Sequence, residues 1–329
     1  MASGNVFITG ASGFIGSAIA INCLKAGYHL RVSLRKEEQI AKIRALLSEY
    51  GTDFEFVIVP DITHEDAFTG KLDGVDYVLH LAAPLPYSIP EKGCFDPAVK
   101  GTTSILKAAL KIPSIKKVLL TSSLAAFLPL SGLPEGAVIT ECDNRHFDYD
   151  ESRDLADPYR RYMATKLVAD KAASAFRETA QPHYSLITLH PTCVYGHNLV
   201  QESPADVWAY TNRHMWEVIM DKCPVSWFGG VHIQDVVDAH LRVLERDIPD
   251  GSKYLLAGPS ISSKEVKQVM EKLYPHVETS FGEISEHRTL PTDASKAERE
   301  LGIQWKPLED MISGIMDQQL ALREQAAQG

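Results

Sequence analysis

Two residues four positions apart could carry out acid–base chemistry. Tyr162 and Lys166 form the only Y-x-x-x-K pattern in the chain. On a helix, side chains at this spacing lie on one face, so the ammonium would stand near the phenol. A nearby positive charge favours the phenolate and lowers the pKa of a tyrosine from its usual value of about 10, which suits proton transfer nearer neutral pH. Ordinary surface pairs have the same spacing, so the pattern needs support from the rest of the chain.

Three hydroxyl residues could supply a partner for this pair. Thr121, Ser122 and Ser123 end an apolar run that is typical of a buried strand. In a doubly wound sheet the carboxyl ends of the strands border the ligand crevice, so the Ser123 hydroxyl could hydrogen-bond a substrate oxygen. The alternative is that these hydroxyls only cap the segment that follows the strand.

A glycine-rich turn indicates a second ligand. The pattern G-x-x-G-x-x-G follows a strand-like run at 6–9 and leads into a helical pattern at 17–26. Glycines allow the tight turn and the close approach of a pyrophosphate, which the free N–H groups and the dipole at the helix start attract. In this context the pattern predicts a dinucleotide site rather than a simple structural turn. The candidate cofactor contacts in it are Gly10, Ser12, Gly13, Phe14, Ile15 and Gly16.

The end of the second predicted strand favours NADPH over NADH. NAD sites usually place an acidic residue there, where it accepts a hydrogen bond from the ribose 2′-hydroxyl. This chain has Arg35 instead, with Lys42 nearby. An acid would repel a 2′-phosphate, whereas arginine pairs with it through charge-assisted hydrogen bonds. The alternative is a solvated helix start, since Glu37 and Glu38 follow at once.

Two further strand ends fit a dinucleotide. Asp61 and Ile62 follow the third strand-like run, where a carboxylate can accept a hydrogen bond from an adenine amine. Asp61 could equally cap a helix that follows it. The fourth run closes with Leu81, Ala82 and Ala83, a stretch whose small side chains would let the backbone approach the ribose.

These residues must be positioned by a common scaffold. Apolar, β-branched runs alternate with amphipathic segments through the first half of the chain, which is typical of βαβ units around a parallel sheet. Right-handed crossovers between them predict an α/β fold with a doubly wound (Rossmann) sheet. The expected strands are at 6–9, 30–34, 54–59, 77–82, 117–121 and 184–189, and the expected helices are at 15–26, 37–50, 66–70, 97–110 and 155–178.

The second half has weaker patterns and predicts a smaller, mostly helical region. A capping box at Ser295 and Glu298 and a stop at Gly302 are expected to bound its last short helix. We expect an NADP-binding Rossmann domain at 1–190 and a substrate-binding region at 191–329, partly interleaved with the first. Regular elements are expected in the second half as a strand at 253–256 and helices at 235–244, 263–273 and 295–301.

Composition limits the classes of partner. The formal net charge of -10 disfavours nucleic acid and anionic membranes. The five cysteines form no C-x-x-C pair and no apolar stretch is long enough to span a bilayer, so we expect a cytosolic protein without a membrane partner. No histidine spacing is typical of a metal site, and His80 and His190 are expected to be hydrogen-bonded residues of the sheet.

The motifs above resemble those of an extended short-chain dehydrogenase/reductase. The resemblance is greatest to the group of dihydroflavonol reductases, cinnamoyl-CoA reductases and yeast-type carbonyl reductases. It continues in HPTCVYG at 190–196, VHIQDV at 231–236 and DASK at 293–296, and so covers nearly the whole chain.

The resemblance implies a mechanism. NADPH would give hydride to a carbonyl carbon, Tyr162 would give a proton to the oxygen, and Ser123 would orient the carbonyl. Lys166 would lower the Tyr162 pKa and hold the nicotinamide ribose, so both members of the pair would also contact the cofactor. The resemblance adds three cofactor contacts, which are Thr121, Pro191 and Val194.

Other stretches narrow the substrate. The segment at 157–163 lacks the Asn-Trp-Tyr-Cys run of plant cinnamoyl-CoA reductases, which disfavours a CoA thioester. The segment at 124–130 is wholly apolar where flavonoid reductases place Asn or Asp, which disfavours a flavonoid. Apolar walls at 85–87, at 124–130 and within 208–216 suit a hydrophobic ketone or aldehyde, such as a polyketide or terpenoid intermediate, although the tryptophans could simply pack the core. The insertion at 130–158 is expected to be a surface loop near the cleft.

Two rival functions share these motifs. An NAD-linked sugar-nucleotide epimerase or hydroxysteroid dehydrogenase would have the same fold, but Arg35 and the apolar stretch after Ser123 disfavour it. A non-catalytic NADP-sensing regulator would typically lack the Tyr–Lys pair, which is intact here. We therefore predict an NADPH-dependent ketoreductase of a small hydrophobic substrate, and the sequence specifies no oligomeric state.

Overall fold

Seven strands form one sheet in the computed structural model, which describes residues 4–83, 93–129, 136–141, 155, 157–222, 229–284 and 291–328. The strand order is β3-β2-β1-β4-β5-β6-β9, and the pairings that join β3, β2, β1, β4, β5 and β6 are parallel. The predicted α/β doubly wound fold is confirmed. The strands are β1 (Asn5–Thr9), β2 (His29–Leu34), β3 (Phe54–Ile58), β4 (Tyr77–His80), β5 (Lys117–Thr121), β6 (Ser185–Pro191) and β9 (Lys253–Leu256).

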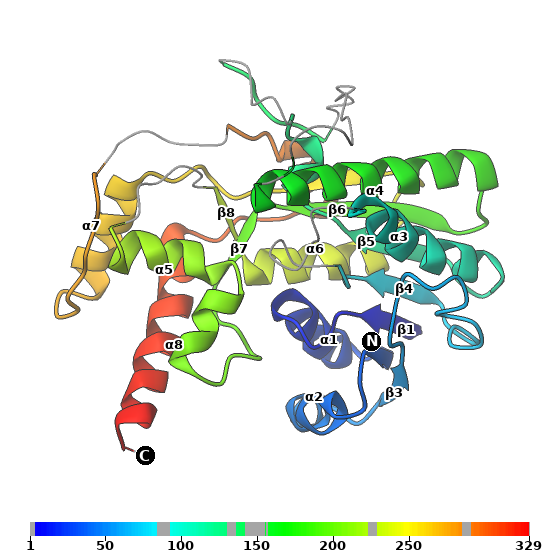
Figure 1. The fold of residues 1–329 in the computed structure, drawn as a ribbon, viewed down its shortest axis with the longest axis horizontal. Coiled ribbons are helices and arrows are strands. Elements are labelled where there is room, and N and C mark those ends of the chain that lie inside the picture. The colour runs from blue at the N-terminus through cyan, green and yellow to red at the C-terminus, as the bar shows by residue number, and fades with distance from the viewer. Residues whose placement is uncertain are drawn as a thin grey trace. The chain divides into compact units, whose positions relative to one another are not determined.

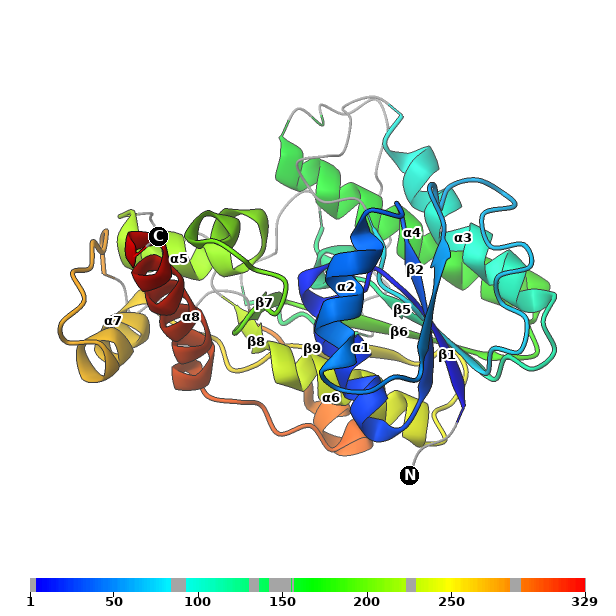
Figure 2. The ribbon, with the colours of Figure 1, turned by 90° about the horizontal axis from the view of Figure 1, so that it is seen from below.

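The chain divides into two compact units. The first consists of Met1–Glu135, Glu141–His190 and His240–Tyr254, and the second of Gly136–Thr140, Pro191–Ala239 and Leu255–Gly329. In the first unit, α1 (Phe14–Ala26) and α2 (Gln39–Ser48) lie on one face of the sheet, while α3 (Phe95–Leu110) and α4 (Pro158–Ala180) lie on the other (Figure 1, Figure 2).

Helices on both faces explain why the strands are nearly continuous apolar runs. Phe7, Val78 and Val118 come from adjacent strands and are fully buried. They pack in one cluster with Ile105 of α3 and Ala173 of α4. Burying a large apolar side chain contributes about 1.5–3 kcal/mol relative to leaving it exposed, so this cluster fixes the helices against the sheet.

Two expectations for the first unit are wrong in detail. Strand β4 ends at His80 rather than at 82, because the N–H groups of Leu81 and Ala82 donate to the Thr9 hydroxyl instead of continuing the ladder. The expected helix at 66–70 is a series of turns, whose backbone bonds span three residues and which ends at Gly70 with a positive φ of 68°.

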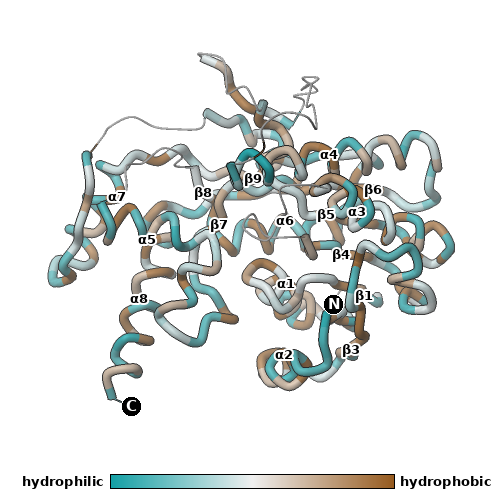
Figure 3. Tube along the Cα trace, in the orientation of Figure 1, coloured by the Kyte–Doolittle hydropathy of each residue, from teal (hydrophilic) through white to brown (hydrophobic). Residues whose placement is uncertain are grey.

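The second unit contains a small parallel pair of strands, β7 (Cys193–Tyr195) and β8 (Gly230–His232). Its core joins α5 (Asn212–Met220), α7 (Ser263–Leu273) and α8 (Leu308–Gln328). The sequence analysis missed α8, although hydrophobic and hydrophilic stretches alternate along it (Figure 3). Within the described ranges, no helix combines the length and the apolar character needed to cross a membrane.

The capping box expected at Ser295 does not form. The Ser295 hydroxyl accepts a hydrogen bond from Arg299, and Glu298 accepts one from Trp305, so both side chains are engaged elsewhere. The chain is nevertheless helical over 295–301, as expected, with π-type turns from Ala297, and the helix ends at Gly302 with a φ of 70°. The capping box of this unit's α7 lies instead at Ser262.

The turn between β1 and α1 brings the backbones of Gly10 and Gly16 close together. A Cβ atom on Gly16 would lie 2.1 Å from the Gly10 carbonyl oxygen, whereas a Cβ on Gly13 would lie 3.4 Å from the same oxygen. We predict that Gly16→Ala destabilises the protein by about 1–3 kcal/mol through overpacking. Gly13→Ala should keep the wild-type melting temperature. Thermal unfolding of the two variants measures the difference, and equal melting temperatures would contradict the proposed contact.

Candidate active site

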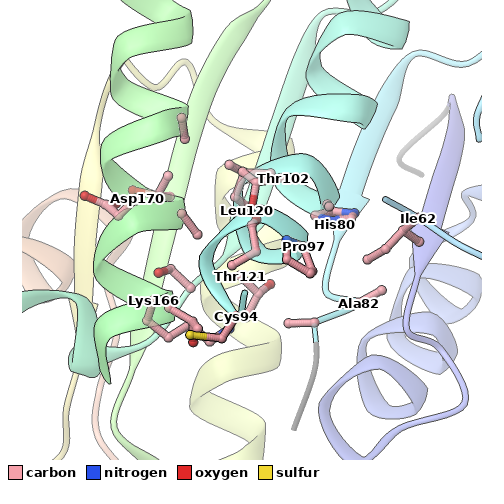
Figure 4. Close-up of a pocket in the computed structure, with 18 of the residues that line it drawn as sticks. Ile62, His80, Ala82, Cys94, Pro97, Thr102, Leu120, Thr121, Lys166 and Asp170 are labelled. Atoms are coloured by element: carbon pink, nitrogen blue, oxygen red, sulfur yellow. Dashed lines mark hydrogen bonds between the residues drawn. The ribbon is translucent and has the colours of Figure 1, made fainter. Parts of the chain in front are cut away.

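A cavity of about 340 Å³ lies in the first unit where several strands end. It extends between α3, α4 and the sheet, and Figure 4 shows Thr121 between Lys166 and Ala82. Its lining includes residues predicted from the sequence, namely Arg35, Ile62, Ala82, Ala83, Thr121 and Lys166. It also includes residues that the sequence analysis did not assign to the site, among them Cys94, Asp170 and Thr188.

Helix α4 brings Tyr162 and Lys166 together. The helix begins at Pro158, later than expected, because the Asp157 side chain caps it by accepting a hydrogen bond from the Arg160 N–H at 2.7 Å. One turn then separates the pair, and the Lys166 Nζ lies 5.5 Å from the centre of the Tyr162 ring. Burial lowers the pKa of Lys166 to about 8. The predicted proximity is therefore present in the fold, and the ammonium remains mostly charged at pH 7.

The hydroxyls after β5 have different environments. The Thr121 hydroxyl lies 2.8 Å from the His240 Nε2, and Ser122 lines the cavity. Ser123 caps a short 3₁₀ helix at Leu124–Phe127, where its Oγ accepts a hydrogen bond from the Ala125 N–H at 3.1 Å. The capping alternative thus holds for Ser123, and its hydroxyl hydrogen can still be donated to a ligand.

The glycine-rich turn fits a pyrophosphate. Gly13 caps α1 through its backbone, no side chain caps this helix start, and its first turn carries no acidic residue. The first N–H groups and the positive end of the helix dipole can therefore meet an anion. Gly10 has a φ of 77°, and a Cβ there would lie 3.0 Å from the Ala82 N, so only glycine lets the turn pack against the loop after β4. Phe14 is buried, and its contact with the cofactor stays a prediction.

Arg35 stands at the edge of the cavity with an exposed side chain. Lys42 is also exposed, on α2. Asp61 Oδ1 accepts hydrogen bonds from the N–H and the hydroxyl of Thr63, each at 2.8 Å, so Asp61 caps a turn and not a helix. These two bonds, helped by the Arg35 charge, hold the pKa of Asp61 below its usual value. An exposed guanidinium at this edge suits the 2′-phosphate of NADPH.

His80 helps to fix the start of the loop after β4, where Ala82 and Ala83 line the cavity. The Thr9 Oγ accepts from the N–H groups of Leu81 and Ala82 at 3.1 and 3.0 Å, so its own hydrogen points to the His80 Nδ1, 3.0 Å away. Burial and the Lys166 charge lower the pKa of His80 to about 4. His80 is therefore neutral, which confirms the expected role of a hydrogen-bonded histidine. Among the described residues, no group of three His, Cys, Asp or Glu is placed to hold a metal ion.

Several predicted residues lie elsewhere or outside the described chain. Pro191 and Val194 belong to the second unit, and their contact with the cofactor stays a prediction. The apolar residues at 124–129 are buried. Trp216 packs in the core of the second unit, which agrees with the alternative that the tryptophans are core residues. Trp208, in contrast, is 44% exposed. The wall at 85–87 and most of the insertion at 130–158 lie outside the described residues.

Comparison with known proteins agrees with this geometry. The family model described as "NAD dependent epimerase/dehydratase family" matches residues 6–257. The ketoreductase sphI of Aspergillus fumigatus is 48% identical over 97% of this chain and 98% of its own. The ketoreductase azaE of Aspergillus niger is 27% identical over 95% of this chain and 98% of its own.

Solved structures show the same fold. The yeast methylglyoxal/isovaleraldehyde reductase Gre2, solved as a complex with NADPH, matches with a TM-score of 0.85 and 24% identity over 97% of this chain and 99% of its own. The family match spans most of the chain, and it includes the glycine-rich turn, Ser123, Tyr162 and Lys166. This chain therefore belongs to the NAD dependent epimerase/dehydratase family.

Proposed function

We propose that this protein is an NADPH-dependent reductase that transfers hydride to the carbonyl carbon of a hydrophobic ketone or aldehyde. The observation that carries the proposal is the Lys166 ammonium 5.5 Å from the centre of the Tyr162 ring, with Lys166 lining a cavity bordered by the strand ends. The 48% identity to a protein named as a ketoreductase supports the same reaction class.

The first unit offers a group for each part of the cofactor. The start of α1 would hold the pyrophosphate, Arg35 the 2′-phosphate and Lys166 the nicotinamide ribose. Asp61 and the loop at 81–83 would border the adenosine. When bound, NADPH supplies the hydride, and the protein's task is to orient the carbonyl and to move one proton.

Three side chains would do this work. The Tyr162 hydroxyl holds the proton that the substrate oxygen receives. The Lys166 charge stabilises the phenolate that remains, which makes the proton easier to give. The Ser123 oxygen already accepts a backbone N–H, so its hydrogen is available for the substrate carbonyl and would polarise it.

The segment after Ser123 supports a substrate class. It is apolar and buried at 124–129, so it presents no polar side chain that would bind the hydroxyl groups of a flavonoid, and this supports a polyketide-like ketone of secondary metabolism as the substrate. We also assign the protein to the cytosol. Cys23, Cys94 and Cys193 are free thiols, which agrees with a reducing compartment.

Removing the Tyr162 hydroxyl tests the proposed reaction. We predict that Tyr162→Phe lowers kcat by about 10²–10⁴-fold, the usual contribution of a general acid, while NADPH binding is unchanged. The measurement is NADPH oxidation against a panel of hydrophobic ketones and aldehydes, with NADPH titrated by fluorescence. Tyr159→Phe, which removes an exposed hydroxyl from the same helix, is the matched control. A wild-type protein that binds NADPH but reduces no panel member would favour the sensing regulator.

The Lys166 pKa predicts how the reaction depends on pH. The charged form is the active one, so kcat/KM for reduction should be retained below about pH 8 and lost as the pH rises through that value. Arginine keeps its charge at every accessible pH. In Lys166→Arg, the fall should therefore move to higher pH, even if the overall rate is lower. Superimposable profiles for the two proteins would remove Lys166 from the explanation.

Arg35 predicts the choice of cofactor. Arg35→Ala removes a charge-assisted interaction worth about 1.5–3 kcal/mol, so the NADPH Kd should rise about 10–100-fold while the NADH Kd stays within a factor of two. Lys107→Ala, the loss of an exposed cation in the last turn of α3, should change neither value. Titration of both cofactors into the three proteins decides the point, and an unchanged NADPH Kd in Arg35→Ala would exclude the proposed phosphate contact.

A further inference from the structure

A histidine beneath the turn after β5 has no part in the mechanism above. His190 is fully buried near the end of β6. Its Nδ1 lies 3.2 Å from the carbonyl oxygen of Ser123, and its Nε2 lies 2.9 Å from the Thr188 hydroxyl oxygen. The ring of Phe127 stacks on the imidazole, with the ring centres 4.2 Å apart and the planes tilted by 34°. His190 therefore contacts both ends of the 123–127 segment.

The partners determine which nitrogen carries the hydrogen. The Ser123 carbonyl can only accept, so the His190 Nδ1 must be the donor. Burial lowers the pKa of His190 to about 4 in spite of the opposing Asp170 charge, so the ring is neutral and its Nε2 is an acceptor. The Thr188 hydroxyl therefore donates to Nε2.

The surrounding charges agree with this assignment. The Asp170 Oδ1 lies 3.6 Å from the His190 Nε2 and has no hydrogen-bond partner in the described part of the chain, as expected if that nitrogen carries no hydrogen. The other Asp170 oxygen is paired with Lys253. The charges of Lys253 and Lys166 also disfavour protonation of His190.

Two bonds to β6 then fix the backbone of consecutive residues. The Ser122 N–H donates to the Leu189 carbonyl at 2.8 Å, which continues the ladder one residue beyond β5. The ladder ends at this point, because the chain turns into the 3₁₀ helix after Ser123. His190 holds the Ser123 carbonyl with a side-chain donor, and so fixes the backbone of the residue that carries the Ser123 hydroxyl.

We propose that His190 is a positioning residue, which holds the Ser123 hydroxyl in place for the substrate carbonyl by donating its Nδ1 hydrogen to the Ser123 backbone. The proposal rests on the role of Ser123 in the proposed function. It requires a donor at the Nδ1 position and does not require an imidazole.

Two substitutions separate the donor from the ring. Asparagine places its amide Nδ2 at the same number of bonds from the backbone as the histidine Nδ1, and it can donate, whereas leucine cannot. His190→Leu should lower kcat about 10–100-fold, as misplacement of a reacting group does, with the NADPH Kd within a factor of two. His190→Asn should recover most of the lost rate. Tyr184→Phe is the control for stability, because it removes a buried hydroxyl that donates to the Leu106 carbonyl. It should lower the melting temperature and leave kcat unchanged.

A double-mutant cycle tests whether His190 acts through Ser123. If it does, Ser123→Ala alone and Ser123→Ala with His190→Leu should have the same kcat, because the group being positioned is already gone. The proposal is overturned if the kcat losses of the two single variants multiply in the double variant, or if His190→Leu keeps the wild-type kcat. If Ser123→Ala keeps full activity, the proposed function of Ser123 fails first.

A second readout does not depend on turnover. In protein labelled with ¹⁵N-histidine, the His190 signal, assigned by its loss in His190→Asn, should show hydrogen on Nδ1 and none on Nε2 at pH 7. Hydrogen on Nε2 would refute the bond to Ser123 even if no substrate were found.

Discussion

A lysine ammonium held in a cavity beside an aromatic ring is the constraint around which the first unit is arranged. The structure gives Lys166 no carboxylate partner within its described residues, and burial alone accounts for its lowered pKa. Such a charge lowers the pKa of neighbouring bases. The buried histidines His80 and His190 are neutral, and the Lys166 charge is among the causes in each case. Asp170, which lines the same cavity, is paired with a different cation, Lys253.

His80 and His190 are both neutral, but they carry their hydrogen on different ring nitrogens. His80 and His190 lie near the ends of β4 and β6, where the backbone leaves the sheet and ladder bonds stop. The His80 Nδ1 accepts a hydrogen bond from the Thr9 hydroxyl, and the Thr9 oxygen in turn accepts hydrogen bonds from the N–H groups of Leu81 and Ala82. His190 donates from Nδ1 to the turn at 123. Buried polar groups at these ends are satisfied without any added charge, which would be costly beside Lys166.

Local patterns explain which features could be predicted from the sequence. The strands β1, β2 and β5 are short apolar runs bounded by turn residues, and the Tyr162–Lys166 pair depends only on the period of one helix. Features made by distant segments could not be predicted in this way. The early end of β4 depends on a hydroxyl in β1, and the contact of His190 with Ser123 joins residues 67 positions apart. The capping box at Ser295 failed for a local reason, because Arg299 and Trp305 donate hydrogen bonds to the two side chains from four and seven positions further along the chain.

The position of Arg35 has a consequence for how such proteins diverge. Arg35 directly follows β2, and its side chain is exposed. Its backbone N–H donates a hydrogen bond to the side-chain oxygen of Gln39 at 3.1 Å. The loop conformation is therefore maintained by a neighbour and not by the guanidinium. Selection can replace this one side chain without disturbing the packed interior. Under the proposed function, in which Arg35 holds the 2′-phosphate, the choice between the two dinucleotides would depend on a surface side chain, whereas proton transfer would depend on residues held in the packed interior.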